Sequence, residues 1–377
     1  MLAHIHKLID KSKGSISISD FMNAALYHEE YGYYMNKLPL GKDGDFITAP
    51  EISQLFGEVI AIWLMHTWKK LGKPSQFSLV ELGPGKGTLI HDVIRVTKGY
   101  SSFFGSMSIH LVEISPILRK IQKEKLKRLD INWHEDIDNL PKQPTIFLAN
   151  EFFDALPIDQ FVYCNGKWYE NRVIKQDDNS LSLSFQCITR KKDDVIPVPL
   201  SCHASSATLG SSKIDCKQVD ETTKNWIPVS ATCMTEGFNG PIVEVCPAGI
   251  EILKRLEKKI VNNGGAALII DYGYVYPLYK STLQSVKQHK YANFLENVGN
   301  SDITALVNFQ ALKDSLKYVN CKILTQREFL YLFGIKERTQ ILMENANDEQ
   351  RDRIFSEFLR LTENMGTLFK AMLIQHL

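Results

Sequence analysis

Three glycines at alternate positions mark the stretch of the chain best suited to bind a small anionic group. Residues 77–88 read Phe-Ser-Leu-Val-Glu-Leu-Gly-Pro-Gly-Lys-Gly-Thr. Glycine lets the backbone adopt positive φ and lets a ligand approach main-chain atoms that a Cβ would shield. The first amides of a following helix face an anion. The pattern predicts a ligand-binding turn made of Glu81, Gly83, Gly85, Gly87 and Thr88.

A second acid follows the next apolar run. Residues 108–112 are typical of a buried strand, and Glu113 follows them directly. A carboxylate at this place in an α/β unit accepts hydrogen bonds from both hydroxyls of a ribose. A third short strand is predicted at 131–133, and Asp136 beyond it is placed to contact an adenine edge. The sequence therefore predicts a nucleoside beside the glycine turn.

The best candidate for reaction chemistry follows a fourth predicted strand, 145–149. It reads Asn-Glu-Phe-Phe-Asp-Ala-Leu-Pro over residues 150–157. In open α/β sheets the reacting groups lie just beyond the carboxyl ends of strands. We assign Asn150, Glu151 and Asp154 to catalysis, with the two carboxylates holding a cation against a dry wall of phenylalanine. The alternative is a helix start capped by Asn150.

Two further polar blocks are predicted to contact the acceptor of the reaction. Thr48, Pro50 and Glu51 stand in a loop rich in small, acidic and hydroxyl residues, although capping of a helix that runs on to Trp63 also explains them. Asp271 and Tyr272 follow a fifth predicted strand, 266–270. Aromatic residues among the first 36 either pack this segment onto the main domain or line a pocket.

The elements that position these residues alternate between buried strands and helices. We expect a helical N-terminal extension over 1–75, in which Ser19 caps a helix, and the first part of an α/β domain over 76–158. A β-rich insertion over 159–240 begins with a hairpin whose turn is Asn165-Gly166 and includes an irregular part from 190 to 239. The remainder of the α/β domain is expected over 241–377.

The composition of the chain argues against several classes of binding partner. The 377 residues are 44% hydrophobic and 23% charged, with a formal net charge of +1, so no bulk charge favours nucleic acid or an anionic membrane. The seven cysteines have no zinc-finger spacing, so we expect no metal. The first ten residues resemble neither a signal peptide nor a transit peptide, which indicates a cytoplasmic protein.

The glycine turn and the acids after the second and fourth strands together describe a class I methyltransferase that binds S-adenosylmethionine. The glycines run Gly-x-Gly-x-Gly after an acid, whereas the dinucleotide fingerprint runs Gly-x-Gly-x-x-Gly. Lys86 is followed by Gly87 and not by the serine or threonine of a phosphate-binding P-loop. A methionine carboxylate and amine fit a glycine turn flanked by Glu81.

Several blocks of the sequence resemble the MidA family. They are Gly-Asp-Phe-Ile-Thr-Ala-Pro-Glu-Ile-Ser (44–53), Glu-Leu-Gly-Pro-Gly-Lys-Gly-Thr (81–88), Val-Glu-Ile-Ser-Pro (112–116), residues 150–157 and Ile-Asp-Tyr-Gly-Tyr (270–274). Mitochondrial members of that family are assembly-factor methyltransferases that symmetrically dimethylate an arginine on a core subunit of respiratory complex I. The resemblance implies an α/β fold with a class I (Rossmann-like) methyltransferase sheet, S-adenosylmethionine as cofactor and a protein arginine as acceptor.

Two other functions remain open on the sequence alone. The chain could be a non-catalytic complex I assembly or chaperone protein that retains cofactor binding, or a methyltransferase acting on a small molecule. The expected location is the cytoplasm of a bacterium, or the mitochondrial matrix if a targeting segment has been removed. Neither nucleic acid nor stable membrane insertion is expected.

Overall fold

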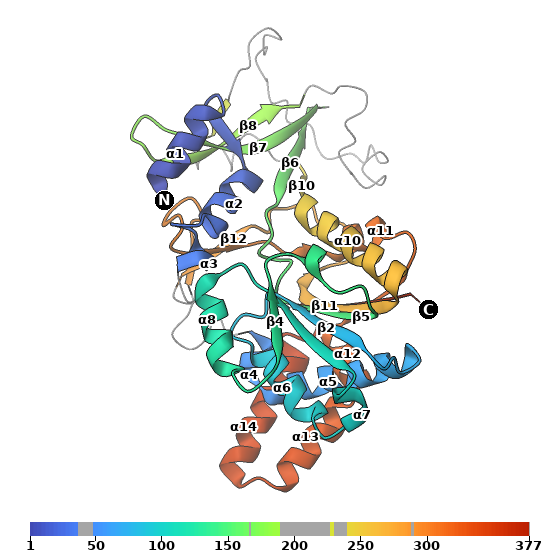
Figure 1. Ribbon diagram of the computed structural model, residues 1–377. Coiled ribbons are helices and arrows are strands. Elements are labelled where there is room, and N and C mark those ends of the chain that lie inside the picture. Colours follow the sequence, from blue (N-terminus) through green and yellow to red (C-terminus); the bar gives the residue numbers. More distant parts are fainter. Residues whose placement is uncertain (37–47, 166, 189–226, 230–239, 288–289, 377) are drawn as a thin grey trace.

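The computed structural model describes residues 1–36, 48–165, 167–188, 227–229, 240–287 and 290–376. Its lower body is built around an eight-stranded sheet, and a smaller sheet lies above it (Figure 1). Most of the predicted irregular part, 190–239, and the turn glycine Gly166 lie outside the described residues. None of the described helices is long and apolar enough to cross a membrane.

The large sheet has the strand order β16-β17-β11-β5-β2-β3-β4, with β15 beside β11. The five predicted strands are confirmed and run parallel: β2 (Phe77–Leu82), β3 (Met107–Val112), β4 (Ile131–His134), β5 (Thr145–Asn150) and β11 (Gly265–Tyr274). The strands β17 (Phe369–His376) and β16 (Asn320–Thr325) extend the sheet antiparallel, and β15 (Val307–Asn308) pairs parallel with β11. Since β11 continues to Tyr274, Asp271 lies inside the strand and not after it.

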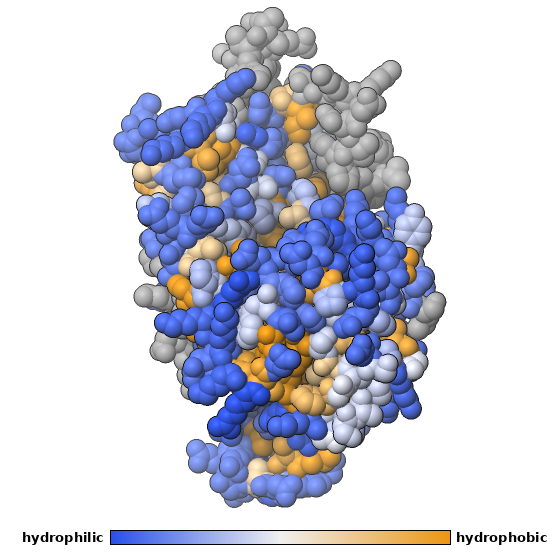
Figure 2. Space-filling view, viewed as in Figure 1, coloured by the Kyte–Doolittle hydropathy of each residue, from blue (hydrophilic) through white to orange (hydrophobic). Residues whose placement is uncertain are grey.

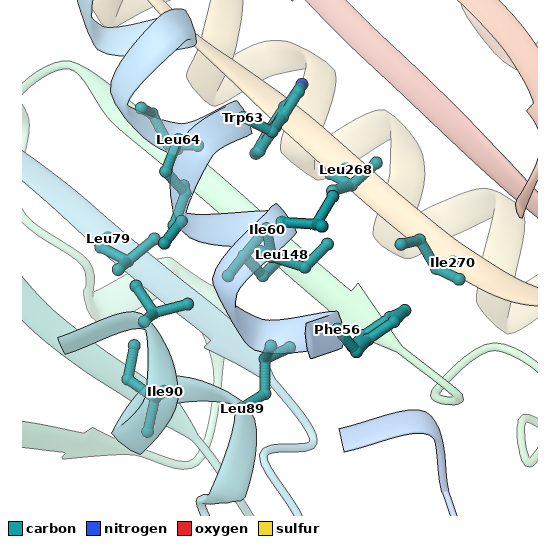
Figure 3. Packing of buried hydrophobic residues seen from close by; sticks show 14 of the residues in the cluster. Phe56, Ile60, Trp63, Leu64, Leu79, Leu89, Ile90, Leu148, Leu268 and Ile270 are labelled. Atoms are coloured by element: carbon teal, nitrogen blue, oxygen red, sulfur yellow. The ribbon is translucent and has the colours of Figure 1, made fainter. Parts of the chain in front are cut away.

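Helices cover both faces of this sheet. Helix α5 (Gln54–Lys70) lies along one face, where Figure 3 shows Phe56, Ile60, Trp63 and Leu64 against Leu79, Leu148, Leu268 and Ile270 of three strands. Helix α6 (Thr88–Thr97) joins this core. The alternate strand residues Val80, Phe147 and Ala267 face α10 (Pro247–Asn263) and α11 (Phe309–Ser315) on the other face. Burial on both faces explains the near-continuous apolar runs of the strands.

One predicted helix start is wrong by two residues, and another predicted helix starts beside Pro50 as expected but is interrupted. Helix α2 (Ile18–Tyr27) is capped by Ser17, whose side chain accepts a hydrogen bond from the Asp20 amide, because Ser17 and not Ser19 has the extended backbone of a cap. The helix expected to run from Pro50 is interrupted at Ser53. There the backbone is extended, so α4 (Ala49–Ile52) ends and Ser53 caps α5.

The smaller sheet has the order β10-β6-β7-β8-β9, and β1 pairs with β7. Strands β6 (Asp159–Cys164) and β7 (Lys167–Lys175) form the predicted hairpin, followed by β8 (Leu181–Cys187) and β9 (Ile227–Val229). The flanking strands β1 (Ser15–Ser17) and β10 (Ile242–Val245) come from outside the expected insertion. The insertion therefore shares its sheet with the N-terminal extension and with the segment that follows.

The remaining elements surround these two sheets. They are α1 (Leu2–Lys11), α3 (Tyr33–Asn36), α7 (Ser101–Phe104), α8 (Pro116–Lys125), α12 (Gln326–Leu332), α13 (Ile335–Glu344) and α14 (Asp348–Leu359). A three-stranded sheet of β12 (Gln284–Lys287), β13 (Lys290–Ala292) and β14 (Asp302–Thr304) was not predicted. In Figure 2, hydrophilic side chains cover most of the visible face and apolar ones gather in the middle of the lower body.

Candidate functional site

A cavity of about 460 Å³ lies at the carboxyl ends of β2, β3, β4 and β5. Eleven predicted site residues line it: Thr48, Pro50, Glu51, Glu81, Gly83, Gly85, Thr88, Glu113, Asp136, Asn150 and Glu151. Four others do not line it: Gly87, Asp154, Asp271 and Tyr272. The structure thus brings together most of the residues that the sequence assigned to one site, from segments more than a hundred residues apart.

The glycine turn forms one wall of the cavity. Gly83, Gly85 and Gly87 have φ values of 59°, 53° and 73°, a region that side chains disfavour. A Cβ on Gly83 would lie 2.7 Å from Cδ2 of Phe152. Gly87 caps α6, its amide donates to the Pro84 carbonyl, and its α-carbon faces Leu126. Gly87 therefore shapes the turn and does not line the cavity.

Glu81 supplies a buried acceptor beside this turn. Its side chain is almost completely buried, and Oε2 has no hydrogen-bond partner among the described residues. Burial raises the pKa of Glu81 to about 8, against the opposing effect of Lys125. Asn150 likewise has a buried Oδ1 without a partner there. Such acceptors fit the ammonium and amine groups of S-adenosylmethionine, because a buried polar atom is costly unless it is hydrogen-bonded.

Glu113 is tied to the turn through Gln122. The Glu113 carboxylate accepts hydrogen bonds from the Ser115 amide (2.9 Å) and from Gln122 Nε2 (3.2 Å). The same Gln122 nitrogen donates to the Gly85 carbonyl at 2.7 Å. Burial raises the pKa of Glu113. The predicted ribose acid is thus held in one orientation by a glutamine on α8 that sequence reasoning missed.

Asp136 stands at the rim opposite the turn. It caps the short helical turn 137–139 and forms an ion pair with Arg255 of α10. Arg255 also lines the cavity. These partners fix the position of the Asp136 carboxylate, and its contact with an adenine edge stays a prediction. Arg255, more than a hundred residues away, carried no signal in the sequence.

Helix α4 connects the two ends of the cavity. Thr88 donates its hydroxyl hydrogen to Glu51 Oε1, and Lys86 Nζ lies 3.7 Å from Glu51 Oε2. At the other end, the Ala49 amide donates to Glu151 Oε1 at 2.9 Å. Thr48 has the backbone of a cap but its side chain makes no capping hydrogen bond. The Thr48 hydroxyl is therefore not committed to the helix it precedes.

Residues 151–157 form an irregular loop, so the alternative prediction of a helix start at Asn150 is wrong. Glu151 has a φ of 50°, and Asn150 Nδ2 donates to its Oε1 at 3.2 Å. Burial raises the pKa of Glu151 to about 7 and that of Asp154 to about 6. Asp154 lies behind the cavity wall, with its Oδ1 lacking a partner within the described part of the chain.

Asp271 and Tyr272 do not fit the predicted direct contact with an acceptor. The Asp271 side chain is fully buried and accepts hydrogen bonds from main-chain amides of the 151–157 loop. The Tyr272 ring packs against Phe369, and its hydroxyl lies 3.5 Å from Gln284 Nε2. Both side chains support the wall of the cavity from behind.

Two tyrosines of the N-terminal extension complete the wall. Tyr27 and Tyr34 line the cavity with their rings stacked, 5.7 Å apart. The Tyr27 hydroxyl donates to the Ala155 carbonyl, and that of Tyr34 donates to Asp302 Oδ1, both at 2.9 Å. Of the two predicted roles for the early aromatic residues, lining a pocket holds for these two. Across the described residues, no group of three or more His, Cys, Asp or Glu side chains could hold a metal ion.

Comparison with known proteins agrees with this geometry. Residues 59–325 match the family model described as "Putative S-adenosyl-L-methionine-dependent methyltransferase". Proteins named "Protein arginine methyltransferase NDUFAF7, mitochondrial" are similar to the chain. The one from Danio rerio is 34% identical over 95% of this chain and 82% of its own length, and the human one is 34% identical over 92% and 76%.

A solved structure from Burkholderia thailandensis, bound to S-adenosyl-homocysteine, has a similar fold. Its TM-score is 0.76 at 21% identity, covering all of this chain and 91% of that one. At this identity the likeness concerns the fold, which agrees with the predicted class I methyltransferase sheet. The matched family model also fits the predicted cofactor. So do the glycine turn and the Glu81 Oε2 atom, which has no partner among the described residues. The chain belongs to the family of S-adenosylmethionine-dependent methyltransferases whose model matches residues 59–325.

Proposed function

We propose that the protein transfers methyl groups to an arginine side chain of a protein. The observation that carries this proposal is the position of the Glu151 carboxylate, which lines the same cavity as the glycine turn. Asp154 lies behind it, and the two carboxylates interact electrostatically. Buried acids are costly unless a cation is paired with them, and a guanidinium is the cationic side chain with the geometry to bridge a carboxylate. The names of the similar relatives support the same acceptor.

When bound, S-adenosylmethionine supplies a methyl group on a positively charged sulfur. Glu151 would hold the guanidinium and draw its positive charge toward the far nitrogens, which leaves the near nitrogen more nucleophilic. Transfer would form a C–N bond at the expense of the S–C bond, and one N–H proton would have to leave the acceptor nitrogen. A carboxyl whose pKa burial raises to about 7 is suited to accept that proton near neutral pH.

The acceptor arginine belongs, in our proposal, to a subunit of respiratory complex I, and its symmetric dimethylation supports assembly of that complex. The sequence blocks that resemble the MidA family and the NDUFAF7 relatives motivate this choice. Under this proposal the protein acts in the assembly of complex I, in the mitochondrial matrix or the bacterial cytoplasm.

The test compares Glu151→Gln with Glu244→Gln. Glu244 is a second buried glutamate. It accepts hydrogen bonds from Gln160 and Thr282 and lies outside the cofactor cavity. We expect Glu151→Gln to bind S-adenosylmethionine within about threefold of wild type while arginine methylation falls by 10² to 10³, and Glu244→Gln to retain turnover. Calorimetry gives the affinity, and mass spectrometry of complex I subunits gives methylarginine.

Three outcomes separate the alternatives. Wild-type turnover in Glu151→Gln would remove that residue from the chemistry. Cofactor binding without any methylated product would favour the non-catalytic assembly protein. Turnover on small amines in the absence of protein would favour a small-molecule methyltransferase.

A further inference from the structure

We propose that Asp271 is a positioning residue for methyl transfer: from inside β11 it holds the loop that carries Glu151 in its reactive shape. This inference rests on the proposed function, because it concerns the residue that would face the acceptor. Asp271 itself does not line the cavity. Its effect on the reaction would pass through the main chain of residues 151–154.

The contacts of the Asp271 carboxylate converge on that loop. Oδ2 accepts hydrogen bonds from three consecutive amides, those of Phe152 (3.1 Å), Phe153 (2.9 Å) and Asp154 (3.2 Å). Oδ1 accepts from the Tyr272 amide at 2.9 Å. The Glu151 amide, one residue earlier, donates to the Ile270 carbonyl at 2.9 Å. The loop is thus attached to β11, at Ile270 and Asp271, by four successive amides.

These hydrogen bonds take the place of those that a helix or strand would provide. The loop belongs to no helix or strand, so its buried amides need acceptors from elsewhere. Asp271 has no exposed surface. Burial raises the pKa of Asp271 well above its ordinary value, whereas the amides that point at its oxygens favour the charged form. The two oxygens of the carboxylate accept from four amides, those of residues 152–154 and of Tyr272, whereas an asparagine has one acceptor oxygen and would set its NH2 donor against an amide N–H.

Two residues of the site depend on this attachment. Glu151 has a φ of 50°, a left-handed conformation that is unfavourable for a non-glycine residue and persists only where the surroundings enforce it. Phe152 lies against Gly83, where a Cβ would come within 2.7 Å of its ring. The loop therefore sets the Glu151 carboxylate and, through Phe152, packs directly against the cofactor turn.

The chain offers a matched control in Glu257 of α10. Its Oε1 accepts hydrogen bonds from the amides of Lys317 (2.7 Å) and Tyr318 (2.6 Å), and its side chain is also buried. Glu257 therefore attaches a loop by the same chemistry, but it does not line the cofactor cavity. A general role in stability predicts that Glu257→Gln and Asp271→Asn behave alike.

The experiment measures amide hydrogen exchange and steady-state kinetics in both variants of the full chain. In Asp271→Asn we expect faster exchange at residues 152–154, a kcat at least 30-fold lower, and a KM and cofactor affinity within about fivefold of wild type, since a displacement of about 1 Å can cost 10²-fold. In Glu257→Gln, exchange should rise at 317–318 while kcat stays within threefold. Equal loss of kcat in the two variants, or faster exchange at 152–154 with normal kcat, would overturn the proposal.

Asp271→Ser serves as a second variant, since a serine hydroxyl is smaller but cannot reach three amides. We expect the same kinetic pattern from it. If neither variant folds, Asp271 is required for folding and a specific role in transfer is overturned. If the wild-type protein methylates a different acceptor, the proposed function is contradicted but the role of Asp271 is not. The comparison of kcat and exchange rates would then be made with that acceptor.

Discussion

The two ends of the cavity are built in different ways. At the cofactor end, the continuous stretch 77–88 supplies the strand, the turn and the helix start, and Glu113 follows the neighbouring strand. At the acceptor end, Ala49, Glu151 and Asp271 come from three segments. They are linked by hydrogen bonds from main-chain amides to the carboxylates of Glu151 and Asp271. One end depends on local backbone geometry and the other on tertiary contacts, so substitutions should separate cofactor binding from methyl transfer.

The largest effect is expected at the glycine turn. Gly85 has a φ of 53° and lines the cavity, so Gly85→Val introduces both backbone strain and a side chain where the ligand approaches. We expect the affinity for S-adenosylmethionine to fall more than 100-fold by calorimetry. Gly72→Val is the control, since Gly72 has a φ of 80° but nothing within 4 Å of its Cβ position. Normal affinity in Gly85→Val would contradict the assignment of this turn.

A smaller effect, about 30-fold in affinity, is expected from Glu81→Gln. Burial raises the pKa of Glu81 to about 8, so near pH 7 the carboxyl is largely protonated. If it accepts a hydrogen bond from the ammonium of the cofactor, binding must release a proton, and wild-type affinity should rise by up to tenfold per unit from pH 6 to 8. Calorimetry in buffers of different ionisation enthalpy measures this release. Glu81→Gln should release no proton and show a flat pH dependence.

The cofactor end was predictable from sequence because its signals are local. Alternate glycines after a buried strand fix a turn, and the acid after the next strand lies at the same sheet edge. Asp271 illustrates the limit. Its place after an apolar run predicted a group facing the acceptor, but β11 continues past it and the side chain serves a loop 117 to 119 residues away in the sequence. Arg255 and Gln122 were missed for the same reason.

At the acceptor end, the dependence of kcat/KM on pH should report Glu151 in the free enzyme. Burial raises its pKa from 4.5 to about 7, and transfer needs the ionised form, so kcat/KM should fall about tenfold from pH 8 to pH 6. Stability should change in the opposite direction. Between pH 4.5 and 7 the folded protein binds this proton more tightly than the unfolded chain, so the contribution of Glu151, up to about 3 kcal/mol, is lost as pH rises.

Steady-state measurements of kcat/KM, together with urea unfolding over the same pH range, test both signs. Glu151→Gln should remove the contribution of this group to the pH dependence of stability. A kcat/KM that rises as pH falls below 7 would exclude an ionised Glu151 from the reaction.

The smallest effect is expected from Tyr34→Phe, which tests whether the N-terminal extension belongs to the acceptor end. The substitution removes the hydrogen bond to Asp302 Oδ1 but keeps the ring stacked on Tyr27. A hydrogen bond to a charged group contributes about 1.5–3 kcal/mol to stability. Only the part of this loss that displaces the cavity wall should weaken binding of the acceptor. We expect a three- to tenfold rise in KM for the protein acceptor and an unchanged affinity for S-adenosylmethionine. If the cofactor affinity falls instead, the extension supports the cofactor end through the hydrogen bond from Ser115 to the Tyr34 carbonyl, and the boundary between the two ends must be moved.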